Sequence, residues 1–213
     1  MRLAPTGQIL DTCQKSWGLS AQPKLIRKVE NFVYESKIEE KKVFLRIAET
    51  HKRNDKEVES ELLWLEFLLK NGISTCMFIP TISGAPFIKV SDAKLDFIAT
   101  LFLGVSGKQA KDPSDFTPEM FKKWGHYIGQ LQEKSRLFQS TVKDFNRKSW
   151  SQDSLYLMVE DEIQTEVGYI FEVFTELKKK LLYLEKDPLS YGLIHADLHH
   201  GNFFLDQNTN LTS

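Results

Sequence analysis

The sequence predicts an α+β fold with two lobes, a small β-rich lobe over residues 1–104 and a mainly helical lobe over residues 105–213. The first half contains short stretches rich in β-branched and aromatic residues, separated by charged turns, which is typical of strands. The second half carries apolar residues at spacings of three and four, which indicates amphipathic helices. With 213 residues, the chain is long enough for two lobes that each have a core.

The first elements along the chain are a helix and a hairpin. Apolar residues at helical spacing predict a helix over residues 9–17, and Gly18 supplies a stop signal. Strand-like stretches follow over residues 31–34 and 43–47. The charged turn over residues 39–42 separates them, so this region is expected to form a β-hairpin.

A second helix is predicted to begin at Asp55 and to end at Asn71-Gly72. Its apolar face carries Val58, Leu62, Leu65 and Leu69. Its other face carries Glu57, Glu59 and Glu61. Two more strands are expected over residues 87–90 and 97–103, after which a polar stretch marks the lobe boundary at about residue 104.

Two long helices are expected in the second lobe. Thr117 is a predicted N-cap, Pro118 suits the first helical position, and apolar residues at helical spacing follow up to Leu131. The second helix is predicted from Ile163 until Asp187-Pro188 halts it. A coiled coil is the rival interpretation of this stretch, but about three heptads with interrupted surface charge do not favour it.

The composition restricts the classes of partner. The 28 basic and 29 acidic residues give a net charge of −1, so we expect no nucleic-acid partner. The longest apolar stretch, over residues 97–105, is too short to span a bilayer. Cys13 and Cys76 have no C-x-x-C or metal-ligand spacing, which fits a reducing compartment. These features predict a cytoplasmic globular protein that does not bind membranes.

The strongest functional signal is the segment His195-Ala196-Asp197-Leu198-His199-His200-Gly201-Asn202. Asp197, expected to be a buried acid, could take a proton from a hydroxyl, and Asn202 five positions later could hold a metal ion. Residues 191–194 and 203–205 are apolar and strand-like, and residues 206–210 form a predicted turn. A loop held between packed elements can aim both side chains into a cleft.

This H-x-D-L-H-x-G-N pattern resembles the catalytic loop of the aminoglycoside phosphotransferase and choline kinase family, which has a protein-kinase-like fold. The resemblance extends upstream to a hairpin ending in Val43–Arg46, a helix containing Ser60–Leu65, a hinge-like strand and two helices. It implies a two-lobed enzyme that transfers the γ-phosphate of ATP to a hydroxyl of a small molecule such as an aminoglycoside, choline or homoserine. ATP and Mg²⁺ are the implied cofactors.

The resemblance also implies roles by position in the catalytic loop. Asp197 would orient the acceptor hydroxyl and accept its proton, His199 would support that acid, and Asn202 would hold Mg²⁺. His195 would hold the loop by hydrogen bonds.

Further roles are implied in the first lobe. Arg46 would contact the α- and β-phosphates, and Glu61 would pair with Arg46 and fix its direction. Glu57 or Glu59 could take the place of Glu61, because one sequence does not settle the helix register. Phe102, Leu103 and Val105 in the hinge-like segment would bind the adenine edge.

Two departures from the family pattern stand out. Residues 28–31, where protein kinases have a Gly-rich phosphate loop, contain no glycine, which argues against a protein kinase. Family members continue past the catalytic loop to a second metal-binding Asp, whereas this sequence ends at Ser213. Asp206 is no substitute, because it precedes that segment. The expectation is a truncated chain with impaired activity.

Two other interpretations remain open. His195, Asp197, His199 and His200 could be metal ligands of a hydrolase or a metal-storage site. Alternatively, the chain could be a catalytically inactive module of the same fold that binds a nucleotide or a partner.

Overall fold

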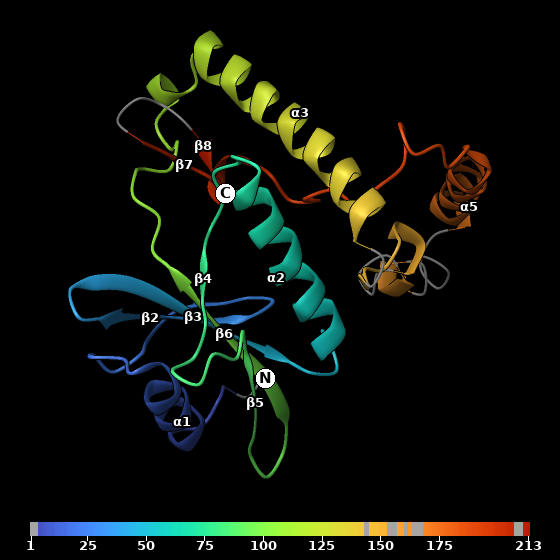
Figure 1. Cartoon of the computed structure of the whole chain (residues 1–213). Coiled ribbons are helices and arrows are strands. Elements are labelled where there is room, and N and C mark those ends of the chain that lie inside the picture. Colours follow the sequence, from blue (N-terminus) through green and yellow to red (C-terminus); the bar gives the residue numbers. More distant parts are fainter. Residues whose placement is uncertain (1–3, 143–144, 153–156, 160–161, 163–167, 207–210) are drawn as a thin grey trace.

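The computed structural model describes residues 4–142, 145–152, 157–159, 162, 168–206 and 211–213. Figure 1 shows a β-sheet with helix α1 on one face and helix α2 on the other, and a helical part beyond α2. The second helix of that part, α5, stands apart from the sheet. The predicted α+β class is confirmed.

The sheet is antiparallel, with strand order β1-β2-β3-β6-β4 and with β5 paired to β6. The strands are β1 Lys24–Lys28, β2 Phe32–Ile38, β3 Lys41–Glu49, β4 Phe78–Ile79, β5 Ile88–Ser91 and β6 Asp96–Leu103. The predicted hairpin is confirmed as β2 and β3, although its connection is only Glu39-Glu40 because β3 begins earlier than expected. Two strands were not predicted: β1, whose residues are all exposed, and β4, which is too short to give a periodic signal.

The alternation of side chains along β3 and β6 divides the core into two layers. Val43, Leu45 and Ile47 of β3 are completely buried on the face that packs against α1. Helix α1 (Gly7–Trp17) closes this layer, and the indole of Trp17 donates a hydrogen bond to the Ile79 carbonyl at 2.8 Å. As predicted, the helix stops at Gly18, whose φ of 65° is left-handed.

Helix α2 (Asp55–Lys70) covers the other face of the sheet. Its N-terminus has a capping box, in which the Glu57 amide donates to Asn54 Oδ1 at 3.0 Å and the Asn54 amide donates to Glu57 Oε2 at 2.9 Å. Val58, Leu62 and Leu65 are buried, as their spacing predicted, whereas Leu69 is only partly buried and Leu68 lies in the core instead. The helix is capped by Asn71, so its predicted bounds are confirmed.

Helix α3 (Pro118–Thr141) begins as expected, because the Thr117 hydroxyl accepts a hydrogen bond from the Met120 amide at 3.2 Å and Pro118 occupies the first turn. It shares one hydrophobic cluster with α2. Within that cluster the Trp64 indole donates to the Ser135 hydroxyl at 3.1 Å, and both residues are buried. The core therefore extends across the boundary expected at residue 104.

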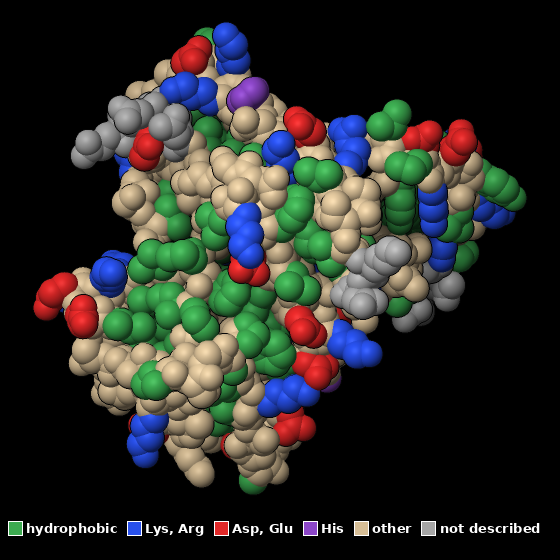
Figure 2. All heavy atoms as spheres, in the orientation of Figure 1, with side chains coloured by type: hydrophobic (Ala, Val, Ile, Leu, Met, Phe, Trp, Pro, Cys, Tyr) green, Lys and Arg blue, Asp and Glu red, His purple; other side chains and the backbone are tan. Residues whose placement is uncertain are grey.

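Helix α5 (Gly168–Tyr183) buries none of its residues. Figure 2 shows hydrophobic side chains at the surface over α5. The predicted start at Ile163 lies outside the described residues. The helix ends before the predicted stop, because Leu184 donates to the Leu181 carbonyl in a tightened last turn and Asp187 starts a separate turn with Ser190. Among the described residues, no helix is long and apolar enough to cross a membrane.

The last part of the chain brings the His195 segment back to the helical core. Strands β7 (Phe204–Leu205) and β8 (Leu211–Thr212) pair antiparallel. In the part of the chain that the structure describes, 3₁₀ turns cover Pro113–Asp115, Trp150–Gln152 and His200–Asn202. Residues 207–210 of the predicted turn lie outside the described residues. The strand-like prediction for residues 191–194 is wrong, because the Leu193 amide donates to the Gln139 side chain of α3 rather than to a neighbouring strand.

Candidate active site

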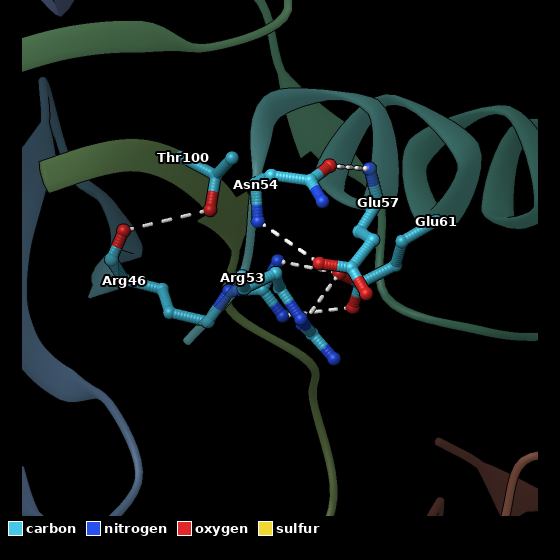
Figure 3. Close-up of polar contacts among 6 residues, drawn as sticks. All are labelled: Arg46, Arg53, Asn54, Glu57, Glu61 and Thr100. Atoms are coloured by element: carbon cyan, nitrogen blue, oxygen red, sulfur yellow. Dashed lines mark hydrogen bonds and ion pairs between the residues drawn. The ribbon is translucent and has the colours of Figure 1, made fainter. Parts of the chain in front are cut away.

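The first half of the site is a bidentate ion pair between β3 and α2. Arg46 lies on the α2 side of the sheet, where its Nη1 donates to Glu61 Oε1 at 2.8 Å and its Nη2 donates to Glu61 Oε2 at 2.9 Å (Figure 3). The pairing partner is therefore Glu61. Glu57 is instead occupied by the capping box and by Lys148 at 3.3 Å, and Glu59 is exposed.

Burial and the neighbouring charges together determine the protonation states of Arg46 and Glu61. The side chains of Arg46 and Glu61 are 18% and 17% exposed. Burial by itself raises the pKa of Glu61, but the charges of Arg46 and Arg53 outweigh it and lower that pKa to about 2. The carboxylate of Glu61 likewise raises the pKa of Arg46 against the opposing effect of burial. Both groups are charged at neutral pH, and the fork-like contact sets the direction of Arg46.

A second guanidinium, which the sequence analysis missed, contacts the same carboxylate. Arg53 Nη1 donates to Glu61 Oε2 at 2.8 Å. Arg53 directly precedes Asn54, the N-cap of α2, and this position lets its side chain run alongside the first turns of the helix toward Glu61 (Figure 3). A basic residue beside an N-cap was the only signal in the sequence, and it is a weak one.

The helix that carries Glu61 is also attached to the segment that follows α3. The Asn146 amide donates to the Ser60 hydroxyl at 2.6 Å, and Lys148 contacts Glu57. Phe145 packs edge-to-face on Phe138 of α3, with ring centroids 5.6 Å apart. These contacts tie α2 to the segment that follows α3.

The structure reduces the number of hinge groups that could bind the adenine edge. The Phe102 side chain is only 8% exposed, and its ring lies 4.7 Å from the Arg46 guanidinium, so it supports Arg46. The Leu103 amide already donates to the Met77 carbonyl at 2.8 Å. The Leu103 carbonyl and the backbone of Val105 are the hinge groups for which adenine binding stays a prediction.

The second half of the site is the loop around Asp197. Asn202 Nδ2 donates to Asp197 Oδ2 at 2.7 Å and to the Asp197 carbonyl at 2.9 Å. The Asp197 side chain is 71% exposed, so the expectation of a buried acid is wrong. The hydrophobic contacts of the loop come from its other residues, Leu198 and Phe203, which point into the core while Asp197 faces outward.

His199 lies beside this acid, with Nε2 3.7 Å from Asp197 Oδ1. Its Nδ1 accepts a hydrogen bond from the Gly201 amide at 3.0 Å. When the ring is neutral its proton is therefore on Nε2, the nitrogen that faces the carboxylate.

His195 and Ala196 shape the entry to the loop. The Asp197 amide approaches His195 Nδ1 at 3.4 Å, and Ala196 has a φ of 66°, a left-handed conformation that costs a non-glycine residue energy. Burial lowers the pKa of His195, although the charges of Asp197 and Glu61 act in the opposite direction. Leu198 of this loop packs against the hydrophobic cluster that contains Phe102, the neighbour of Arg46, so one cluster connects the two halves of the site.

The loop is supported from behind by residues 107–110, which the sequence analysis did not assign to the site. Gln109 Nε2 donates to the Gly201 carbonyl at 2.6 Å, and Lys108 exchanges two backbone hydrogen bonds with Leu205, at 3.0 and 2.8 Å. Gly107 has a φ of 123° and lies against the Leu205 backbone. No local pattern in the sequence signals these contacts, because they join residues almost one hundred positions apart.

The histidines of the loop do not converge on a metal site. His200 turns toward the Ala110 carbonyl, at 3.2 Å, and packs on Phe116. Within the part of the chain that the structure describes, no group of three or more His, Cys, Asp or Glu residues could hold a metal ion. The interpretation as a His/Asp metal site therefore gains no support.

Comparison with protein families gives a match over residues 24–212 to the phosphotransferase enzyme family. Among curated proteins, the amicoumacin kinase of Bacillus subtilis (strain 168) is 28% identical over 201 residues. The alignment covers 93% of this chain and 59% of that protein, so the chain spans less than two thirds of the relative's length.

Solved structures agree on the fold. An amicoumacin kinase in complex with AMP-PNP, Ca²⁺ and Ami superposes with a TM-score of 0.87 at 23% identity, over 99% of this chain and 63% of that chain. A microcompartment-associated aminopropanol kinase gives 0.73 at 22% identity, over 97% and 68%. A spectinomycin phosphotransferase in complex with ADP gives 0.60 at 14% identity, over 99% and 68%. The chain thus belongs to the phosphotransferase enzyme family and has its protein-kinase-like fold.

Proposed function

We propose that this chain is the nucleotide-binding and catalytic part of an ATP-dependent phosphotransferase that modifies a hydroxyl of a small molecule. The observation that carries the proposal is the Asp197–Asn202 contact of 2.7 Å, on a loop whose Leu198 packs against the hydrophobic cluster that contains Phe102, the neighbour of Arg46. A proton acceptor, a neutral oxygen ligand and a fixed guanidinium are three of the elements that phosphoryl transfer uses.

In this proposal the nucleotide lies between the two lobes, whose boundary stays at about residue 104. Glu61 and Phe102 hold the Arg46 guanidinium in place, and its remaining N–H groups bind the α- and β-phosphates. The Leu103 carbonyl and the Val105 amide bind the adenine edge.

Asp197 orients the acceptor hydroxyl for in-line attack on the γ-phosphate and accepts its proton. Its exposure supports this role, because an acceptor can reach the carboxylate directly. The hydrogen bond from Asn202 fixes one carboxylate oxygen, and His199 lies beside the other. His199 is thus assigned a supporting role.

The residues of the loop also fit a divalent cation. Because Asn202 Nδ2 donates to Asp197, the Asn202 Oδ1 atom is the free end of that amide, and amide and carboxylate oxygens are ligands that Mg²⁺ prefers. Bound Mg²⁺ would neutralise the charge that develops on the transferred phosphoryl group. Asn202 would then hold the cation while Asp197 stays available to the hydroxyl.

The names of the relatives, which refer to amicoumacin, aminopropanol and spectinomycin, support a small-molecule acceptor. We take a small hydroxyl compound as the acceptor and amicoumacin as the first candidate to assay. We assign the protein to the cytoplasm, where ATP is present and where Cys13 and Cys76, both free thiols, would stay reduced.

The test combines thermal denaturation in Mg-ATP with an assay of phosphate transfer from ATP to the three named compounds. This chain is run beside a longer version of the protein that matches the length of the relatives. Stabilisation by Mg-ATP in both, with transfer in the longer version, is the expected result. Stabilisation without transfer in either would favour a catalytically inactive nucleotide-binding module, and the absence of both would contradict the proposal.

A further inference from the structure

Arg46 and Arg53 use the Glu61 carboxylate in different ways. Arg46 is bidentate, with Nη1 and Nη2 each donating to one oxygen. Arg53 is monodentate and reaches only Oε2. A guanidinium has five N–H donors, so Arg53 keeps four that Glu61 does not use. Within the described part of the chain, Glu61 accepts the one side-chain hydrogen bond that Arg53 donates.

The cluster therefore holds more positive charge than its own carboxylate neutralises. Two guanidiniums share one carboxylate, and the Arg53 side chain is 29% exposed. The pKa of Arg53 is lowered, mainly by burial and also by the charges of Arg46 and Arg147. Glu57 attracts Arg53 but already interacts with Lys148 and with the Asn54 amide. Holding like charges together in a partly buried place costs energy, which functional sites tolerate when a ligand supplies the opposite charge.

The position of the cluster points to the kind of ligand. Arg53 shares the Glu61 carboxylate with Arg46, the residue assigned to the α- and β-phosphates, so the surplus charge lies beside the proposed phosphate site. The planar guanidinium is the side chain best suited to phosphate oxygens. A nucleotide whose phosphate chain lies between Arg46 and Asp197 would bring several negative charges to this place.

We propose that Arg53 is a second phosphate-binding residue of the nucleotide site, acting beside Arg46. Its Nη1 keeps the contact with Glu61, and its other donors bind an oxygen of the phosphate chain. The proposal rests on the proposed function, since it requires that ATP bind between the lobes. It predicts that the contribution of Arg53 to affinity grows with the number of phosphates.

The experiment measures dissociation constants of AMP, ADP and ATP in Mg²⁺ by calorimetry for four proteins: wild type, Arg53→Gln, Arg53→Lys and Arg136→Gln. Arg136 is an exposed residue of α3 that makes no polar contact with the other described residues, so its variant removes one positive charge elsewhere. Arg53→Gln should weaken ATP about tenfold or more while changing AMP by less than about threefold, because a charge-assisted hydrogen bond to phosphate is lost.

Arg53→Lys should recover part of the ATP affinity, and Arg136→Gln should bind all three nucleotides as the wild type does. Equal weakening of AMP, ADP and ATP by Arg53→Gln, or no weakening, would overturn the proposal and leave Arg53 as a structural partner of Glu61. That outcome leaves the proposed function intact. If the wild type bound none of the three nucleotides, the proposed function would fail and this proposal with it. Far-UV circular dichroism checks that each variant is folded.

Discussion

The Arg46–Glu61 pair and the Asp197 loop differ in how the protein holds them. Glu61 is 17% exposed, takes three hydrogen bonds from two arginines and lies on a helix packed on both sides. Asp197 is 71% exposed, and its carboxylate depends on Asn202 and His199 within its own loop. The proposed phosphate-binding group is thus held by the core, whereas the proposed proton-accepting carboxylate is held by residues of its own loop. Substitutions in the first half should therefore change stability, and substitutions in the second should change chemistry.

The largest effect should come from Asp197→Ala in a version of the protein that transfers phosphate. Loss of a positioned proton acceptor is expected to lower kcat by about 10²–10⁴-fold, because the acceptor hydroxyl loses the group that orients it. The affinity for ATP should stay close to that of the wild type. Steady-state kinetics measures kcat, and a binding titration measures the affinity for ATP. A kcat equal to that of the wild type would contradict the role of Asp197 as the proton acceptor.

The substitution Glu61→Ala tests the half of the site that the core holds in place, which is the Arg46–Glu61 pair. It leaves Arg46 and Arg53 partly buried without their carboxylate, so we expect a loss of about 3–5 kcal/mol in the free energy of unfolding. Urea denaturation measures it. Glu59→Ala is the matched control, because Glu59 is an exposed glutamate of the same helix and should change the stability by less than about 0.5 kcal/mol. Similar losses of unfolding free energy in Glu61→Ala and Glu59→Ala would contradict the conclusion that the core holds the Arg46–Glu61 pair.

The same carboxylate predicts a dependence of stability on pH. The pKa of Glu61 is lowered to about 2 in the folded protein from an ordinary value of 4.5. A lowered pKa adds stability above the unfolded value and loses it as the pH falls through the folded value. Wild type should therefore lose stability between about pH 4.5 and 2, and Glu61→Gln should lose less over this range. Thermal melts at several pH values check this, and parallel curves for the two proteins would refute it.

A smaller effect is expected at Gly107, which supports the loop. A Cβ at this position would lie 2.4 Å from the Leu205 carbonyl oxygen, and a φ of 123° is strained for any other residue. Gly107→Ala should cost about 2 kcal/mol. Gly125→Ala is the control, since Gly125 is in α3 with nothing within 4 Å of its Cβ position, and it should stabilise the protein by about 1 kcal/mol. Equal effects of the two substitutions in urea denaturation would show that Gly107 is not constrained.

The smallest effect should come from Gln109→Ala. It removes the 2.6 Å hydrogen bond to the Gly201 carbonyl, which is worth about 1 kcal/mol. Hydrogen exchange should increase in residues 199–202 and stay unchanged in α2, because the contact supports only the loop. Faster exchange in α2 would mean that the two halves of the site are coupled.

The sequence predicted what depends on local signals. The bounds of α2 and the start of α3 follow from caps and helical spacing at Asn71, Thr117 and Pro118, and the structure has them as expected. The choice of Glu61 as the candidate partner of Arg46 came from a resemblance, because helix periodicity alone leaves Glu57 and Glu59 open. The capping box removes Glu57 from that choice.

The sequence could not predict what depends on contacts between distant segments. Gln109 contacts Gly201, and Leu193 contacts Gln139, through hydrogen bonds that no local pattern encodes. The exposure of Asp197 and the double use of Glu61 by two arginines are likewise properties of packing. The end of α5 at Tyr183 was missed because apolar spacing continues beyond the residue at which the last turn tightens.

The attachment of α2 to two other segments has a kinetic consequence. The buried Trp64–Ser135 hydrogen bond joins α2 to α3, and the Asn146–Ser60 hydrogen bond joins it to the next segment. Because moving the helix would break both contacts, Glu61 holds Arg46 before any nucleotide arrives. We therefore expect nucleotide association to follow a single exponential whose observed rate rises linearly with nucleotide concentration, limited by diffusion and docking rather than by a slow rearrangement of the helix.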